Sequence, residues 1–148
     1  MTATDEGQVA LRRHLGRVTA GDILDVRRGL DVVSARLAAA ARTEEDLTAL
    51  GQAMERRTAA ARVADLDAFT DADVDFHLSV AEAAHNPLLG DLYRNMSEAL
   101  RETVRAGRCM DEAGDDLYHG ALFEAVRAGD PVAATRAALA ILEGDAAI

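Results

Sequence analysis

The stretch DADVDFHLSVAEAAHNPLL, residues 71–89, decides how the fold of this chain is predicted. Its residues favour a helix that ends before Asn86-Pro87, where a capping side chain precedes a proline suited to the first position of the next helix. Asp73 and His77 are four residues apart, so in a helix they share one face, one turn apart. We therefore expect two consecutive helices, the first carrying a polar pair that is either a binding site or a local hydrogen bond.

The rest of the chain also predicts helices. Ala, Leu, Arg and Glu are frequent, and no segment alternates long enough to indicate a strand. Thr19 with Asp22, and Thr43 with Asp46, match a helix start in which a capping hydroxyl precedes an acid by three residues. We predict an all-α, antiparallel bundle of six or seven helices, at 8–17, 20–41, 44–63, 67–85, 87–106, 113–128 and 131–143.

Apolar periodicity and glycines refine this prediction. In the segment 20–41 an apolar stripe with steps of three and four is expected to face the core: Ile23, Val26, Leu30, Val33 and Leu37. Three glycines are expected at left-handed turns that end helices: Gly107, Gly129 and Gly144.

Length and composition predict one domain, residues 1–148, in which 1–19 form a connector or short helix. A chain of this size buries about 68–70% of its unfolded surface, so its core needs no disulfide or structural metal. The single cysteine, Cys109, cannot pair within the chain, and its acidic surroundings offer no base for catalysis. No apolar run approaches the roughly 20 residues of a membrane span, and the acidic N-terminus is unlike a signal peptide. We expect a cytoplasmic protein.

The formal net charge of −10 argues against binding nucleic acid through this chain's own surface. The arginine pairs at 12–13, 27–28 and 56–57 are interleaved with acids, so we expect solvated helix faces there. We also expect a structural role for His85 at a helix end and a solvated His14.

A second polar motif is HGALFEAVRAGD, residues 119–130, which places His119 on an apolar helix face. With D-x-x-F-H at 73–77 and the following N-P-x-L, it resembles the FCD domain, the C-terminal effector-binding and dimerisation domain of the FadR branch of GntR-type bacterial transcription regulators. The resemblance begins at DILDVRRGLD, residues 22–31, where Asp31 replaces the family's Glu, and continues through the last helix.

The resemblance implies a site for a divalent cation. It assigns Asp73, His77 and His119 as ligands, whereas the position of the family's last histidine holds Ile141. Three protein ligands could still hold Zn²⁺, Ni²⁺ or Mn²⁺ with water or an effector oxygen completing the shell, and Ile141 should weaken the affinity. The resemblance also implies that Arg27 binds an effector carboxylate, the alternative being a surface arginine.

For partners, the resemblance implies a small carboxylate effector, a homodimer, and contact with DNA only through a winged-helix domain that this sequence lacks. Two other functions fit the residues. A plain helical dimerisation module would make the polar residues incidental. A metal-dependent hydrolase would use the same three ligands, but the sequence offers no H-E-x-x-H element to supply a general base.

Overall fold

Seven helices account for most of the chain in a computed structural model that describes residues 3–107 and 112–146. No strand occurs among these residues, so the all-α prediction is confirmed. The helices are α1 (Ala3–Leu15), α2 (Ala20–Ala41), α3 (Glu44–Arg62), α4 (Leu66–Ala83), α5 (Pro87–Gly107), α6 (Glu112–Ala128) and α7 (Pro131–Ala146).

Side-chain caps fix the helix starts that the sequence predicts. In α2 the Asp22 backbone N–H donates to Thr19 Oγ1 at 3.1 Å, and the Thr19 N–H donates to Asp22 Oδ2 at 3.0 Å. Thr43 and Asp46 make the same reciprocal pair at the start of α3. Each pair satisfies backbone donors that the first helical turn leaves without partners. Asp65, which the sequence analysis did not identify, caps α4.

The helix ends are predicted less well than the starts. Gly129 has φ +70° and ends α6 as expected, but Gly144 lies inside α7, which continues to Ala146. The prediction fails at Gly144 because one glycine weakens a helix by only about 1 kcal/mol and need not end it. One helix start also differs from the prediction, because α1 begins at Ala3, five residues before the predicted residue 8.

Arg42 ties the end of α2 to the end of α6. Its Nε donates to the Val126 carbonyl oxygen at 2.9 Å, and its Nη2 donates to the Arg127 carbonyl oxygen at 2.8 Å. The guanidinium therefore caps the last turn of α6 together with the Gly129 N–H, which also donates to the Val126 carbonyl at 3.1 Å.

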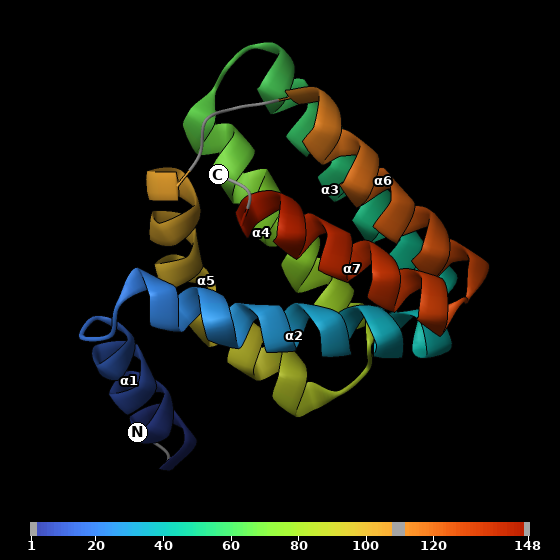
Figure 1. Cartoon of the computed structure of the whole chain (residues 1–148). Helices are drawn as coiled ribbons and strands as arrows, with labels where there is room; N and C mark the ends of the chain where they lie inside the picture. The colour runs from blue at the N-terminus through green and yellow to red at the C-terminus, as the bar shows by residue number, and fades with distance from the viewer. Residues whose placement is uncertain (1–2, 108–111, 147–148) are drawn as a thin grey trace.

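Helix α4 packs against α2, α3 and α5, and α7 packs against α2 and α6 (Figure 1). In Figure 1, α2 crosses the molecule in front, while α3 and α6 run side by side behind α7. Many residues at these crossings are alanines, which let helix axes approach closely. The alanines of the main core cluster are Ala35, Ala38, Ala39, Ala53, Ala83, Ala125, Ala134, Ala137 and Ala138.

The predicted apolar stripe of α2 is only partly buried. Ile23 is buried, but Val26 and Val33 are 53% and 40% exposed. The buried face instead carries polar and small residues: Arg27, Asp31, Ser34, Ala35, Ala38 and Ala39. The prediction failed because it followed the large aliphatic residues, whereas α2 meets the interior through alanines and a polar network.

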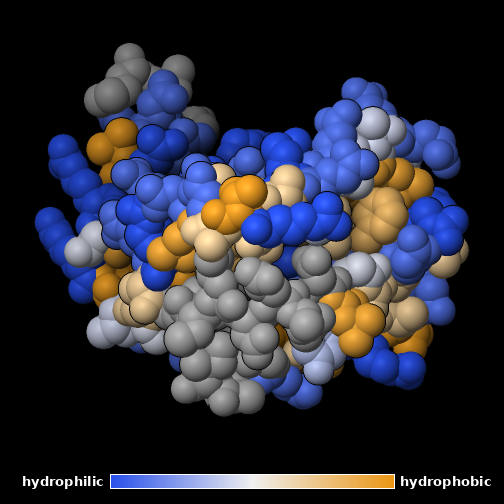
Figure 2. All heavy atoms as spheres, turned by 90° about the horizontal axis from the view of Figure 1, so that it is seen from above, coloured by the Kyte–Doolittle hydropathy of each residue, from blue (hydrophilic) through white to orange (hydrophobic). Residues whose placement is uncertain are grey.

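The surface seen from above in Figure 2 is hydrophilic over much of its area, and its apolar residues form separate patches. Within the part of the chain that the structure describes, no helix combines the length and apolar character needed to cross a membrane.

Candidate metal centre

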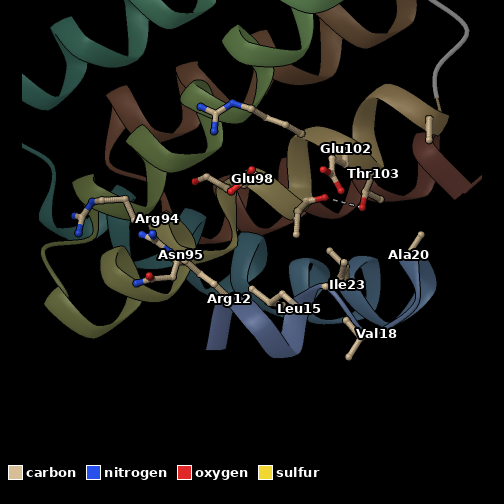
Figure 3. Close-up of a pocket in the computed structure, with 15 residues that line it drawn as sticks. Arg12, Leu15, Val18, Ala20, Ile23, Arg94, Asn95, Glu98, Glu102 and Thr103 are labelled. Atoms are coloured by element: carbon tan, nitrogen blue, oxygen red, sulfur yellow. Dashed lines mark hydrogen bonds between the residues drawn. The ribbon is translucent and has the colours of Figure 1, made fainter. Parts of the chain in front are cut away.

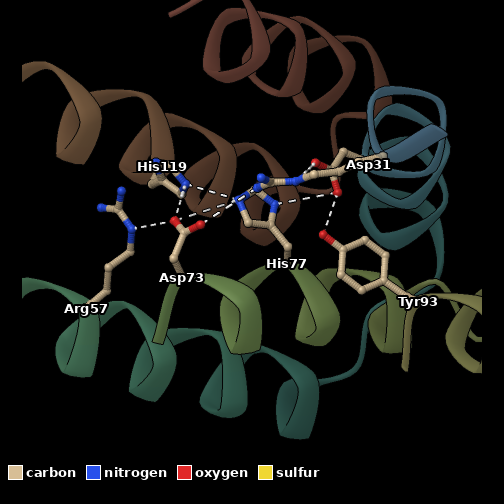
Figure 4. A network of polar contacts seen from close by, with 7 residues as sticks. Asp31, Arg57, Asp73, His77, Tyr93 and His119 are labelled. Carbon is tan, nitrogen blue, oxygen red and sulfur yellow. Dashed lines mark hydrogen bonds and ion pairs between the residues drawn. The ribbon is translucent and has the colours of Figure 1, made fainter. Parts of the chain in front are cut away.

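Two helices supply the residues that the sequence singles out. Helix α4 presents Asp73 and His77 on its inward face, and α6 presents His119 opposite them (Figure 4). All three side chains are buried, with exposed fractions of 3% or less. One donor atom from each lies within 4.8 Å of the others, so the structure brings the three predicted ligands together.

The spacing of these donor atoms fits a metal ion. His77 Nε2 lies 3.1 Å from His119 Nε2, and Asp73 Oδ1 lies 3.2 Å from His119 Nε2 and 4.0 Å from His77 Nε2. Ligands about 2.0–2.2 Å from one tetrahedral Zn²⁺ are separated by roughly 3.3–3.6 Å. The three observed distances lie on either side of this range, so small shifts of the side chains would bring all three donors to one ion. Two imidazoles and one carboxylate are also the donor types that Zn²⁺, Ni²⁺ and Mn²⁺ accept. The residues therefore fit such an ion in both chemistry and position.

Two buried arginines also reach Asp73. Arg57, from α3, places Nε 2.9 Å from Asp73 Oδ1, and Arg27, from α2, places Nη2 3.7 Å from Asp73 Oδ2. Their exposed fractions are 1% and 2%. The expectation that the arginine pairs lie on solvated faces is therefore wrong for these two, although Arg28 and Arg56 are exposed. Each buried arginine lies on the inward stripe of its helix, where a buried charge needs a carboxylate partner.

Asp31 and Tyr93 extend the network on the far side of His77. Asp31 Oδ1 accepts a 2.9 Å hydrogen bond from the Tyr93 hydroxyl and lies 3.7 Å from His77 Nδ1. Asp31 Oδ2 accepts from Arg27 Nε at 3.1 Å. The 3.7 Å separation from His77 Nδ1 is longer than a hydrogen bond, so Asp31 contacts the Nδ1 side of His77 electrostatically while Nε2 lies on the side of the cluster.

Burial controls the ionisation of this network. Desolvation, together with the nearby positive charge of Arg27, holds the pKa of His77 well below its ordinary value. Burial likewise raises the pKa of Asp31, although Arg27 and Tyr93 oppose that rise, and it raises the pKa of Tyr93 well above its ordinary value. The His77 imidazole is therefore neutral at physiological pH, the form in which it can ligate a metal.

A family model for the FCD domain matches residues 22–144, which include every residue of this network. The chain belongs to the FCD domain family. It is an FCD domain of the kind found in GntR-family transcription regulators.

Curated relatives of this FCD domain are bacterial regulators. The HTH-type transcriptional regulator LutR of Bacillus subtilis is 35% identical over 127 residues, which cover 81% of this chain and 57% of LutR. The galactonate operon transcriptional repressor of Escherichia coli is 33% identical over 121 residues, covering 80% of this chain and 52% of the repressor. The chain thus spans about half the length of these relatives, which are named as regulators of transcription and not as enzymes.

A solved structure, Streptococcus agalactiae GntR, superposes with a TM-score of 0.75 at 21% identity, covering 87% of this chain and 59% of that one. At this identity the likeness concerns the fold alone.

An apolar wall borders the cluster in this FCD domain. The Phe76 ring centroid lies 5.4 Å from the centroids of both imidazoles. Phe76 belongs to the same buried apolar cluster as Ile141, which is 2% exposed. Ile141, the residue at which the sequence resemblance predicts a fourth ligand position, is therefore part of the hydrophobic core.

Two buried hydroxyls lie on the same helical stripes as the network. Thr70 is on the α4 stripe with Asp73 and His77, and Ser34 is on the α2 stripe with Asp31. Neither hydroxyl oxygen has a hydrogen-bond partner among the described residues. Buried polar groups are normally hydrogen-bonded, so these oxygens are available to water or to a bound molecule.

A separate groove of about 590 Å³ lies between α1, the start of α2 and α5 (Figure 3). Its lining includes side chains of both charges, namely Arg12, Arg94, Arg101, Glu98 and Glu102. None of the three clustered ligands lines this groove, and we assign the function to the buried cluster because, among the described residues, metal-ligating atoms converge there.

The sequence analysis missed Arg57 and Tyr93 as parts of this centre. The periodicity of α3 held a signal for Arg57, because Leu50, Ala53 and Ala60 share its buried face at helical spacing. Tyr93 had a similar signal, because Leu89, Met96 and Leu100 share its buried face of α5 at helical spacing. Cys109 lies outside the described residues, whereas His14 is exposed as expected. His85, at the end of α4, pairs with Asp46 of α3 at 2.6 Å, which agrees with a structural role.

Proposed function

We propose that this FCD domain is a sensor that binds a divalent transition metal through Asp73, His77 and His119 and a small carboxylate beside that metal. The observation that carries the proposal is the convergence of three buried donor atoms, from two helices, within 4.8 Å of one another. Two imidazoles and a carboxylate that converge in the interior are the donor types that a divalent transition metal accepts, which favours a binding role.

The charge balance supports an anionic effector. Among the described residues of the network, Arg27 and Arg57 carry two positive charges, and Asp31 and Asp73 carry two negative charges. A divalent cation would add two positive charges to this buried and otherwise balanced set, and a bound carboxylate would offset one of them. Arg27 is our candidate for the carboxylate clamp, because its guanidinium lies next to Asp73.

The name of one relative suggests the chemical class of the effector. The Escherichia coli relative is the galactonate operon repressor, and galactonate is a hydroxycarboxylate. A hydroxycarboxylate can present a carboxylate and a hydroxyl oxygen to one metal ion, which suits a site with only three protein ligands. We therefore propose small hydroxycarboxylates as the first compounds to test.

We further propose that the chain dimerises, and that in a regulator with a DNA-reading domain effector binding changes how two such domains are placed. Such a regulator acts in the bacterial cytoplasm. Sedimentation equilibrium of the chain over a range of concentrations tests the dimer directly, and a monomer at all concentrations would contradict it.

The metal proposal is tested by titrating the metal-free protein with Zn²⁺, Ni²⁺ and Mn²⁺ in competition with a chelating dye. We expect one ion per chain in the wild type, and binding lost in Asp73→Asn and in His119→Ala. Asp71→Asn is the matched control, because Asp71 lies on the exposed side of the same helix and pairs with Arg101. Equal binding by Asp73→Asn and Asp71→Asn would reject the proposed ligand set.

The effector proposal is tested by thermal unfolding with galactonate, lactate and citrate, each with and without the metal. A ligand at 100 times its Kd stabilises the folded state by about 2.7 kcal/mol. We expect stabilisation that needs the metal and that weakens in Arg27→Lys, with Arg28→Lys as the exposed control. No stabilisation by any of these acids would favour the plain helical module.

A further inference from the structure

The carboxylate oxygen that would ligate the metal is already engaged by a cation of the protein. Arg57 Nε donates a 2.9 Å hydrogen bond to Asp73 Oδ1. The same oxygen lies 3.2 Å from His119 Nε2 and 4.0 Å from His77 Nε2, so it is the carboxylate oxygen that converges with the imidazoles (Figure 4). Arg57 and a metal ion at the cluster would therefore share one oxygen atom.

The Arg57 guanidinium is held firmly in this place. Its central carbon lies 4.6 Å from the centroid of the Phe69 ring, a cation–π arrangement with a ring of the adjacent helix α4. The side chain is 1% exposed, and moving a guanidinium out of this position would disrupt both contacts. Arg57 is thus a fixed positive charge at the candidate centre and not a mobile surface group.

A guanidinium in this position opposes metal binding through the carboxylate. The charge-assisted hydrogen bond occupies a lone pair of Asp73 Oδ1, and the positive charge repels a cation at short range in a poorly screened interior. Asp73 is the only oxygen donor in the set of three ligands, and the other two donors are imidazole nitrogens. A metal that depends on oxygen ligands loses more from this competition than one that binds strongly to nitrogen.

We propose that Arg57 selects the metal at this centre: by competing for Asp73 Oδ1, it favours Ni²⁺ and Zn²⁺, which bind imidazole well, over Mn²⁺, which prefers oxygen. Arg57 is a positioning residue in this proposal, since it acts through Asp73. The inference rests on the proposed metal site and adds a determinant of affinity and selectivity that lies outside the ligand set.

The test compares dissociation constants for Mn²⁺, Ni²⁺ and Zn²⁺ in the wild type, Arg57→Met and Arg57→Gln. Arg56→Met is the matched control, because Arg56 is the exposed neighbour on the same helix. In Arg57→Met we expect Mn²⁺ to bind more tightly by on the order of tenfold, with a smaller gain for Ni²⁺ and Zn²⁺. Arg56→Met should leave all three constants unchanged.

Thermal unfolding of the metal-free variants separates this role from a purely structural one. Arg57→Met removes a buried partner of Asp73, so its melting temperature without metal should fall. A purely structural role would lower both the melting temperature and the metal affinity, whereas the proposal requires lower stability together with tighter binding. Arg57→Gln has no charge but retains an N–H donor, so it provides the same comparison if Arg57→Met does not fold.

The outcomes distinguish this inference from the function on which it rests. Binding to the wild type that is lost in His77→Ala, with the same Mn²⁺ to Ni²⁺ ratio in wild type and Arg57→Met, would overturn the selectivity role and leave the metal site standing. Binding of none of the three ions to the wild type and to either Arg57 variant would overturn the metal site and this inference together.

Discussion

The hydroxyl of Tyr93 donates a 2.9 Å hydrogen bond to Oδ1 of Asp31, and both side chains are buried. This contact joins α5 to α2 inside the core. The same Asp31 oxygen lies 3.7 Å from Nδ1 of His77, a candidate metal ligand on α4. Tyr93 thus fixes the carboxylate that lies beside His77, without itself contributing a ligand.

Tyr93→Phe should lower the free energy of unfolding by about 1–3 kcal/mol, because it removes a donor from a buried carboxylate. Chemical denaturation measures this directly. Tyr118→Phe is the control, since Tyr118 is 40% exposed and its loss should change stability by less than about 0.5 kcal/mol. Similar small changes in both variants would mean that the Tyr93 hydrogen bond makes no net contribution to the free energy of unfolding.

Alanine substitutions at two glycines should change the stability of the fold in opposite directions. Gly129 has φ +70°, and an added Cβ would lie 3.4 Å from Arg42 Nη2 and 3.5 Å from the Ala39 carbonyl oxygen, so Gly129→Ala should destabilise the fold by about 1 kcal/mol or more. Gly29 lies in helix α2 with nothing within 4 Å of the added Cβ, so Gly29→Ala should stabilise it by about 0.5–1 kcal/mol. Thermal unfolding compares them, and a shift of the same sign in both would contradict this account.

Local signals predicted the fold well because they act within one or two turns. The reciprocal bonds of Thr19 and Thr43 depend on residues three positions away, and both were read correctly from the sequence. The burial of Val26 and Val33 was predicted wrongly because it depends on which face of α2 meets other helices, and apolar spacing alone does not settle that choice.

The candidate site, too, was predicted correctly in one part and wrongly in another. The predicted ligand set came from the resemblance of two segments, in α4 and α6, to the FCD domain, and the structure brings these residues together. Arg57 was placed on a solvated face because neighbouring charges in the sequence suggested one. Its partner, Asp73, lies in the next helix, and a contact between helices leaves little trace in either sequence segment.

Asp46→Asn should lower the free energy of unfolding by an amount that depends on pH. Asp46 is partly buried, which acts to raise its pKa, but bonds from Thr43 and His85 outweigh that effect and hold the pKa below its ordinary value. A lowered folded-state pKa means that the stabilisation is complete above the unfolded-state value of about 3.9 and is lost as the pH falls through the folded-state value.

The expected loss in Asp46→Asn is therefore about 0.5–2 kcal/mol at pH 7, as for other helix-cap substitutions, and it should shrink below about pH 4. Urea unfolding at several pH values measures this difference. Glu45→Gln, at the exposed neighbouring position, should show a smaller loss. A loss in Asp46→Asn that is independent of pH would show that the carboxylate charge is not responsible.

Ile141→His should tighten the binding of Zn²⁺ and Ni²⁺ by on the order of tenfold or more, because it would add a nitrogen donor at the fourth ligand position that the sequence resemblance predicts. Dye competition measures the change. Leu139→His is the control, because Leu139 is 44% exposed on the same helix. Unchanged affinity in a folded Ile141→His variant would show that this side chain does not face the cluster.

The two hydrogen bonds that Arg42 makes with the end of α6 constrain the order of folding. The two acceptors, the carbonyls of Val126 and Arg127, lie 84 and 85 residues further along the chain. A nascent polypeptide leaving the ribosome can wind α2 early, but these two hydrogen bonds form only after Val126 and Arg127 have been synthesised. The end of α2 therefore acquires its contact with α6 later than the hydrogen bonds within its own helix, and the locking of one helix end waits on a segment made much later.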